Sequence, residues 1–216
     1  AGITGSDILK GGRTGIAYGS SYGSPDAVLG FYELKALGAS KNLTATNYIR
    51  MMGQTTAVNI GLFFEITGRI IPTSSACTSG SQAIGYGFES IQMGKADLMV
   101  CGGAEELDIT DAATFDTLFA TSTQNDSPAT TPRPYDRDRD GLVIGEGAST
   151  LILEEYEHAV KRGAKIYAEI VGFACNSDGH HATLPHAGTM QKVMELSLQD
   201  ANLKADDIGF ISGHGT

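Results

Sequence analysis

The sequence has no tryptophan and little cysteine: Cys77, Cys101 and Cys175 are the only three thiols among its 216 residues. They lie far apart and include no Cys-x-x-Cys pair, which argues against a disulfide framework and against a structural zinc site. Sparse, unpaired cysteines are typical of proteins from a reducing compartment. We therefore expect a cytoplasmic protein.

Long apolar runs are missing as well. No segment reaches the roughly 18 consecutive apolar residues that a membrane-spanning helix requires, and no basic stretch followed by an apolar one opens the chain. The sequence therefore predicts no membrane association. The chain begins at Ala1 and stops at Thr216 directly after a motif, so we interpret it as a fragment that lacks both ends.

Positive charge is in short supply. Fifteen lysines and arginines stand against 25 aspartates and glutamates, for a net charge of −10. Nucleic-acid binding needs a basic surface, so nucleic acid is excluded as a general partner. Hydrophobic residues at 41% and charged residues at 19% are ordinary for a globular protein, and the length suffices for one complete core and part of a second domain.

The chain does contain alternating strand and helix patterns. Short apolar runs predict buried strands, and apolar residues spaced three and four apart predict helices. Their alternation is typical of an α/β fold with a buried, mixed sheet. The predicted strands are 15–20, 70–76, 96–102, 148–154, 165–174 and 208–212, and the predicted helices are 24–37, 47–66, 78–93, 155–162 and 189–201.

Cys77 is the first candidate catalytic residue. It lies in Ser-Ser-Ala-Cys-Thr-Ser-Gly, residues 74–80, between a predicted strand and a predicted helix. The start of a helix stabilises nearby negative charge, and small neighbours let a substrate come close, so the position suits a nucleophile. A buried, unreactive cysteine is the alternative. Cys101 and Cys175 fall within strand patterns, and we expect both to be buried and unreactive.

His214 is the second candidate. It stands between Gly213 and Gly215, directly after a predicted strand. That position is exposed at a sheet edge, where α/β proteins bind their ligands. An ordinary loop histidine would explain it equally well by itself. Together, Cys77 and His214 favour nucleophilic catalysis by a thiol.

Five motifs then follow one another in a single order. They are Ser-Ser-Ala-Cys-Thr-Ser-Gly at 74–80, Gly-Gly-Ala-Glu at 102–105, Arg-Pro-Tyr-Asp at 133–136 with Arg-Asp-Gly at 139–141, Gly-Glu-Gly at 145–147 and His-Gly-Thr at 214–216. This series resembles the β-ketoacyl-[acyl-carrier-protein] synthases, the elongating condensing enzymes of fatty acid biosynthesis in the thiolase superfamily. Residues 164–172 are similar to that family too, so the resemblance covers nearly the whole chain.

The resemblance implies a thiolase-like fold with layers in the order α-β-α-β-α, built from two related halves. Residues 1–174 would form the N-terminal half that carries the nucleophile, with its start truncated. Residues 175–216 would begin the C-terminal half. The resemblance also implies a homodimer, in which the strand before the nucleophile pairs with its two-fold mate.

The implied activity is an acyltransferase reaction, the decarboxylative Claisen condensation of an acyl thioester with malonyl-[acyl-carrier protein], which gives 3-oxoacyl-[acyl-carrier protein]. Cys77 would accept the acyl group, and its backbone N–H would contribute to the oxyanion hole. His214 would be the first of two histidines that assist decarboxylation. The second histidine, a lysine and a phenylalanine gate would lie beyond Thr216. Acyl carrier protein is the implied partner, and the chemistry needs no metal or other cofactor.

Three further site residues come from the same resemblance. Tyr22 matches a position that lines the acyl pocket and is often smaller in this family, so we expect a shortened or reshaped pocket; an ordinary turn tyrosine is the alternative. Thr216 would bind substrate next to His214. Lys41 matches a basic position of the surface that docks the carrier protein, although a solvated lysine would look the same.

Two patterns imitate metal sites. Asp-x-Asp-x-Asp-Gly at 136–141 copies the start of an EF-hand loop, but Gly147 stands where the loop needs its bidentate glutamate. His180, His181 and His186 have no carboxylate or cysteine that would complete a ligand set. We predict ordinary polar loops for both.

Rival interpretations stay open. A polyketide ketosynthase would share these motifs. A thiolase would share the nucleophile but use a second cysteine near its C-terminus. A chain-length-factor-like subunit would dimerise and shape a pocket without catalysis. Such subunits usually replace the nucleophile, and Cys77 is retained here.

Overall fold

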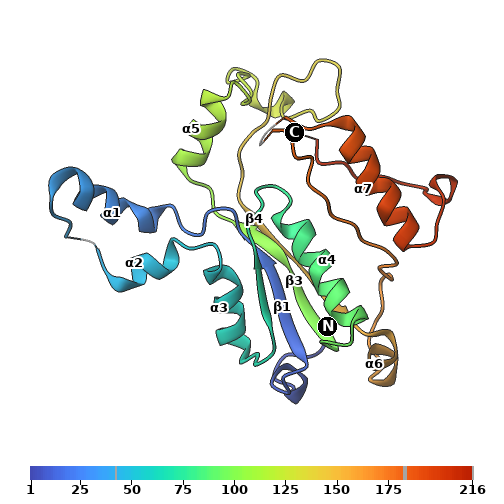
Figure 1. Ribbon diagram of the computed structural model, residues 1–216. Helices are drawn as coiled ribbons and strands as arrows, with labels where there is room; N and C mark the ends of the chain where they lie inside the picture. Colours follow the sequence, from blue (N-terminus) through green and yellow to red (C-terminus); the bar gives the residue numbers. More distant parts are fainter. Residues whose placement is uncertain (42, 182–183, 216) are drawn as a thin grey trace.

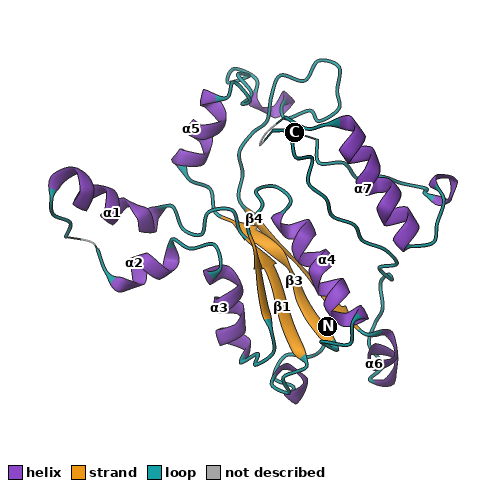
Figure 2. Cartoon of the chain, viewed as in Figure 1, coloured by secondary structure: helices purple, strands orange, loops and turns teal. Residues whose placement is uncertain are grey.

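The computed structural model describes residues 1–41, 43–181 and 184–215. Its centre is a sheet with the strand order β2-β1-β3-β4 (Figure 2). The strands are β1 (Thr14–Gly19), β2 (Ile70–Thr73), β3 (Leu98–Glu105) and β4 (Gly147–Glu154). β1 runs parallel to β2 and β3, whereas β4 is antiparallel to β3. The predicted mixed sheet is therefore confirmed.

Helices surround this sheet and extend beyond it. Within the described residues they are α1 (Asp26–Leu37), α2 (Ala45–Arg50), α3 (Thr55–Phe64), α4 (Ser79–Gln92), α5 (Ile109–Thr117), α6 (Tyr156–Lys161) and α7 (Ala187–Asp200), with short 3-10 turns η1 (Asp7–Leu9), η2 (Pro128–Thr130) and η3 (Ala205–Asp207). α1 and α2 project away from the sheet (Figure 1). Across the described part of the chain, none of these helices has the length and apolarity needed to cross a membrane.

The core lies on both faces of β1, one of the two inner strands of the sheet. Ile16 and Tyr18 pack with Ala57 of α3 in one cluster. Ala17, on the opposite face, packs with Ala83 of α4 in a second cluster. Successive strand residues point to opposite faces, so α3 and α4 cover opposite sides of the sheet. This burial explains why the strand sequence is almost entirely apolar or small.

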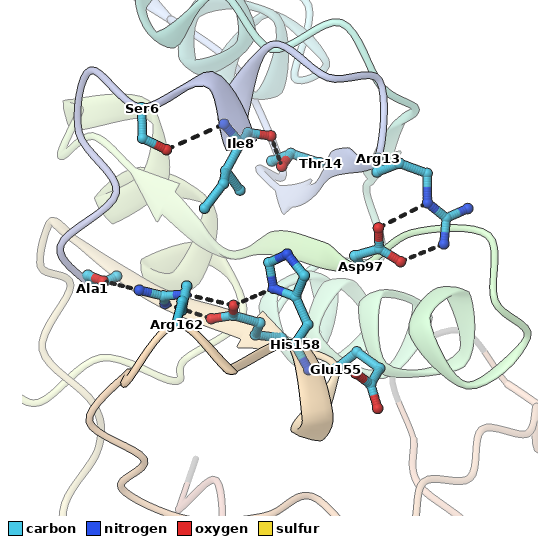
Figure 3. Close-up of polar contacts among 10 residues, drawn as sticks. Ala1, Ser6, Ile8, Arg13, Thr14, Asp97, Glu155, His158 and Arg162 are labelled. Carbon is cyan, nitrogen blue, oxygen red and sulfur yellow. Dashed lines mark hydrogen bonds and ion pairs between the residues drawn. The ribbon is translucent and has the colours of Figure 1, made fainter. Parts of the chain in front are cut away.

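Salt bridges stabilise the end of the sheet where β1 and β3 begin and β4 ends. The carboxylate of Glu154, at the end of β4, accepts hydrogen bonds from Arg162 Nε at 2.6 Å and from His158 Nδ1 at 2.5 Å. Nearby, Arg13 Nε donates to Asp97 Oδ2 at 2.9 Å. Arg13 and Asp97 join the entry to β1 with the entry to β3, whereas His158 and Arg162 join helix α6 and its C-terminal end to the end of β4 (Figure 3).

One predicted helix is in fact two. The pattern over 47–66 predicted a continuous helix, but α2 ends at Arg50 and α3 begins at Thr55. A turn separates them, and a Cβ atom on Gly53 would lie 2.8 Å from the carbonyl oxygen of Ser20. Close contact with the turn after β1 therefore bends the chain where the apolar spacing alone does not show it.

Two predicted strands do not form. Residues 165–174 and 208–212 carry no strand assignment. A strand exists only when a neighbour satisfies its backbone groups, and the described part of the chain offers neither segment a ladder. Cys175 was wrongly predicted to be buried: it is exposed and lies outside any strand. Cys101 is buried in β3, as expected.

Candidate active site

Cys77 lies in the turn between the end of β2 at Thr73 and the start of α4 at Ser79. Its thiol is exposed. β1, β2 and β3 are parallel, so their carboxyl ends meet at this same edge of the sheet, where α/β proteins place their sites. The predicted strand-to-helix position of Cys77 is therefore what the structure shows.

The residue before the thiol is held in an unusual backbone conformation. Ala76 has a φ of 51°, in the left-handed region that residues with a Cβ atom rarely adopt. Ser79 Oγ donates to the carbonyl oxygen of Ala76 at 2.7 Å and accepts from the N–H of Ser75 at 2.8 Å. Thr73 Oγ1 donates to the carbonyl of Ser79 at 2.8 Å. A sharp turn of this kind presents one side chain outward, as nucleophile turns do.

Two glycines let the start of α4 approach the sheet. A Cβ atom on Gly19, at the end of β1, would lie 2.7 Å from Ser79 Cβ. One on Gly103, in β3, would lie 3.3 Å from Gly80 Cα. The positive end of the helix dipole therefore sits against the strand ends beside Cys77, where it can stabilise negative charge on a substrate oxygen.

The His214 turn is packed against a loop from another part of the chain. A Cβ atom on Gly213 would lie 1.9 Å from Tyr135 Oη, and one on Gly215 would lie 2.9 Å from Pro134 Cβ. Pro134 and Tyr135 thus hold both flanks of the exposed His214. The end of the chain lies toward the end of the molecule to which the N-terminus of α4 points (Figure 1). Within the described residues, no hydrogen bond joins His214 to Cys77.

Comparison with known proteins identifies the family. The chain matches the family models of the β-ketoacyl synthase N-terminal domain over residues 1–159 and C-terminal domain over residues 167–216. It belongs to the β-ketoacyl synthase family. Among curated relatives, 3-oxoacyl-[acyl-carrier-protein] synthase 2 of Vibrio cholerae is 39% identical over 213 residues, which cover 94% of this chain and 50% of the relative.

Solved structures agree in fold. A β-ketoacyl synthase from Burkholderia phymatum is 57% identical and superposes with a TM-score of 0.97, covering 100% of this chain and 53% of that one. The ketosynthase of a type II polyketide synthase, solved with its acyl-carrier protein, is 30% identical with a TM-score of 0.83, covering 97% of this chain and 53% of that one. The thiolase-like α/β fold is thereby confirmed. The chain spans about half the length of these relatives.

In this β-ketoacyl synthase chain, Glu105 organises the turn that carries Tyr22. At the end of β3, its carboxylate accepts hydrogen bonds from Ser20 Oγ at 2.9 Å, from Ser21 N at 2.7 Å and from Tyr22 N at 3.4 Å. The sequence offered Glu105 only as the last residue of a motif. The missed signal is an acidic residue that follows the glycines of a buried strand at the sheet edge.

The Tyr22 side chain is 46% exposed. A cavity of about 540 Å³ opens beside this turn, with Ser20, Arg50, Thr55, Asn59, Glu105 and Glu146 among its lining residues. The structure thus brings the Cys77 turn and the Tyr22 turn to one edge of the sheet, because Gly19 packs on Ser79 directly before residues 20–23.

The other predicted site residues lie elsewhere. Lys41 is exposed in the connection between α1 and α2, on the part that projects from the sheet. Thr216 lies outside the described residues. The structure therefore places Lys41 away from the nucleophile turn.

Asp140 and His186, one from each pattern that imitates a metal site, form hydrogen bonds within the described part of the chain. Asp140 Oδ2 accepts from Ser122 Oγ at 2.6 Å and from Thr123 N at 3.3 Å, and Asp140 Oδ1 accepts from Thr131 Oγ1 at 3.2 Å. The hydrogen bond from Ser122 is the main cause that lowers the pKa of Asp140. His186 caps α7 by accepting from Thr189 N at 3.3 Å. These groups are engaged in holding the chain itself.

Proposed function

We propose that the protein is a 3-oxoacyl-[acyl-carrier-protein] synthase of fatty acid biosynthesis, in which Cys77 is the acyl-accepting nucleophile. The observation that carries the proposal is the exposed thiol in a strained turn, at the start of a helix packed on the strand ends. Family membership and the relative named as such a synthase support it.

The proposed chemistry begins with acyl transfer. The Cys77 sulfur attacks the carbonyl of an acyl thioester, and the carrier thiol leaves with the proton that the cysteine gives up. Malonyl-[acyl-carrier protein] then loses carbon dioxide, and the electron pair of the broken bond becomes a carbanion at the thioester α-carbon. The carbanion attacks the acyl group on Cys77, 3-oxoacyl-[acyl-carrier protein] forms, and the Cys77 sulfur leaves as a thiolate that takes up a proton from water. None of these three steps requires a metal or a redox cofactor.

His214 would donate a hydrogen bond to the enolate oxygen during decarboxylation. A neutral imidazole N–H suits that task, because donors preset toward a developing oxyanion stabilise it strongly. Packing of Pro134 and Tyr135 on both flanking glycines gives His214 a defined position. Thr216 would bind substrate next to it. These roles rest on the family resemblance.

Several wider features belong to the same proposal. Acyl carrier protein would be the partner, with Lys41 on its docking surface. Residues 1–174 would form the nucleophile half, and residues 175–216 would begin the second half. The protein would act as a cytoplasmic homodimer. β2 supports this last point because it is an edge strand of the sheet.

A polyketide ketosynthase is the second candidate. The polyketide structure that superposes on 97% of the chain favours it. The two candidates differ in product: a fatty acid synthase extends the acyl group once per reduction cycle, whereas a polyketide ketosynthase extends unreduced chains.

Turnover by the full-length protein tests the proposal. Acyl-carrier protein loaded with a saturated acyl chain is mixed with malonyl-carrier protein, and carbon dioxide release is measured together with the product mass. One condensation per acyl chain, abolished by Cys77→Ala, is the expected result. Repeated extension without reduction would favour the polyketide activity, and turnover that survives Cys77→Ala would refute the nucleophile.

A further inference from the structure

Gln82 lies in the first turns of α4, five residues after the nucleophile, and is half-buried. Its Oε1 accepts a hydrogen bond from Ser75 Oγ at 2.6 Å. Its Nε2 donates to Cys175 Sγ at 3.4 Å. One side chain therefore bridges the nucleophile turn and a segment more than 90 residues further along the chain.

Ser75 is the residue through which Gln82 reaches the turn. The Ser75 N–H donates to Ser79 Oγ at 2.8 Å, and the Ser75 carbonyl accepts from Thr78 Oγ1 at 2.9 Å. Both contacts join Ser75 to residues on the other side of Cys77 in the sequence. The Ser75 hydroxyl also accepts from Thr78 Oγ1, at 3.1 Å, and gives its own proton to Gln82. The position of Ser75 thus sets the path of the backbone on both sides of the thiol.

The segment at the other end of the bridge is anchored independently. The Phe173 ring meets Tyr86 of α4 edge to face at 6.1 Å between centroids. A Cβ atom on Gly85 would lie 2.1 Å from the same ring. The Phe173 N–H donates to Asp200 Oδ2 at the end of α7, at 2.8 Å. Cys175 therefore presents its sulfur to Gln82 from a fixed segment.

We propose that Gln82 is a positioning residue for Cys77. It acts through Ser75, and it aligns the nucleophile turn with the part of the chain that belongs to the C-terminal domain and carries His214. This inference rests on the proposed function, since it concerns the rate at which Cys77 is acylated. A thiol that must meet a thioester carbonyl at a set angle is sensitive to small shifts of its backbone.

The test is single-turnover acylation of Cys77 in the full-length protein. The variants are Gln82→Met, which keeps the side-chain length but removes both hydrogen bonds, Ser75→Ala, and the double variant. Gln92→Met is the matched control, because Gln92 is an exposed glutamine at the other end of the same helix. The maximal acylation rate and the half-saturating concentration of acyl carrier are determined separately.

We expect each single variant to lower the maximal rate about tenfold, in line with loss of a half-buried hydrogen bond, at an unchanged half-saturating concentration. The double variant loses no more than either single variant, because both remove the same link. Gln92→Met reacts like the parent. A change in half-saturation alone, additive losses, or rates equal to the parent would overturn the inference.

A second variant keeps the inference testable if Gln82→Met does not fold. Cys175→Ala leaves α4 intact and removes only the sulfur acceptor, and we expect a loss of about twofold to fivefold in the maximal rate. An unchanged rate would overturn the link to the C-terminal segment. Failure of the parent protein to acylate Cys77 at all would instead refute the proposed function.

Discussion

At the residue scale, the structure gives the three thiols, which lie far apart in the sequence, three different surroundings. Burial in β3 raises the pKa of Cys101 to about 12, which leaves that thiol protonated and unreactive at neutral pH. Cys77 and Cys175 are both exposed. Only Cys77 follows a residue in the left-handed conformation and precedes a long helix. Reactivity is therefore expected to depend on the turn around the thiol as well as on exposure.

The strain at Ala76 can be measured by substitution. Ala76→Val should lower the free energy of unfolding by about 1–2 kcal/mol, because a β-branched side chain fits poorly at positive φ. Ala76→Gly should leave stability within about 1 kcal/mol of the parent, because glycine adopts this φ freely but gains entropy in the unfolded chain. Urea unfolding compares the two. Equal stability of the valine and glycine variants would show that Ala76 is not strained.

Tyr22 is expected to influence which acyl chain lengths are accepted. Its backbone N–H donates a hydrogen bond to Glu105, which fixes where the side chain leaves the backbone at the carboxyl ends of the strands. We expect Tyr22→Gly in the full-length protein to accept longer acyl chains, because a phenol in an acyl tunnel blocks the carbons beyond it and overpacking costs about 1–3 kcal/mol. Product profiles with carriers of graded chain length decide this. An identical profile for parent and variant would place Tyr22 outside the tunnel.

At the scale of elements, sequence patterns located every strand of the observed sheet. The predictions at 15–20, 70–76, 96–102 and 148–154 correspond to β1, β2, β3 and β4. These predictions are correct because residues buried in the sheet are apolar, and a run of apolar residues is visible in the local sequence. The break between α2 and α3 was not predicted, because it arises from contact of Gly53 with Ser20, which lies more than 30 residues earlier in the sequence. Residues 165–174 and 208–212 have the apolar pattern of strands but form none. A strand also needs a neighbour to pair with, and the local sequence pattern does not show whether one is present.

The candidate site divides in the same way. The position of Cys77 was predictable because a strand pattern, a small-residue turn and a helix pattern are adjacent in sequence. The contacts of Glu105 and Gln82 were not predicted, because they join residues far apart in the chain. The local sequence pattern does not show which side chain will form a hydrogen bond with a hydroxyl or a thiol far along the chain.

The junction of β4 and α6 has an acid-sensitive ion pair. Burial alone would raise the pKa of Glu154, but the hydrogen bonds from Arg162 and His158 outweigh it and lower that pKa below 4.5. A lowered carboxyl pKa contributes stability above pH 4.5, and the contribution is lost as pH falls through the folded-state pKa. The Arg162 and His158 side chains point toward each other in Figure 3, and both form hydrogen bonds with the Glu154 carboxylate.

Glu154→Gln tests that contribution. At neutral pH it should lower the free energy of unfolding by about 1–3 kcal/mol, because Arg162 loses its charged partner in a mostly buried site. It should also flatten the decline in stability below pH 4.5. Asp138→Asn is the control, since the Arg137–Asp138 pair is exposed and should matter little. Retention of the full acid decline in Glu154→Gln would assign it to other carboxylates.

At the scale of the whole molecule, apolar surface remains uncovered beside the edge strand β2. Leu62 and Phe63, near the end of α3, are 72% and 79% exposed, and Ile70 of β2 is 38% exposed. Edge strands with apolar surroundings invite pairing with another chain, and a two-fold contact between copies would cover both. This agrees with the homodimer expected from the family resemblance.

Sedimentation of the full-length protein tests the dimer. We expect a dimer at micromolar concentration and a shift toward monomer in Phe63→Asp, because a charge in an apolar interface is costly. Phe119→Asp is the matched control, an exposed phenylalanine after α5. A parent that sediments as a monomer, or equal dissociation of both variants, would contradict an interface at this surface.

Mapping the acyl group on the protein tests whether Cys77 is the acylated nucleophile. Full-length protein is mixed with an acyl-carrier thioester, digested, and examined by peptide mass spectrometry. We expect acylation of Cys77, none on the buried Cys101, and little on Cys175, which is also exposed but lacks the strained turn and helix start. Acyl transfer to Cys175 as fast as to Cys77, or none to Cys77, would contradict it.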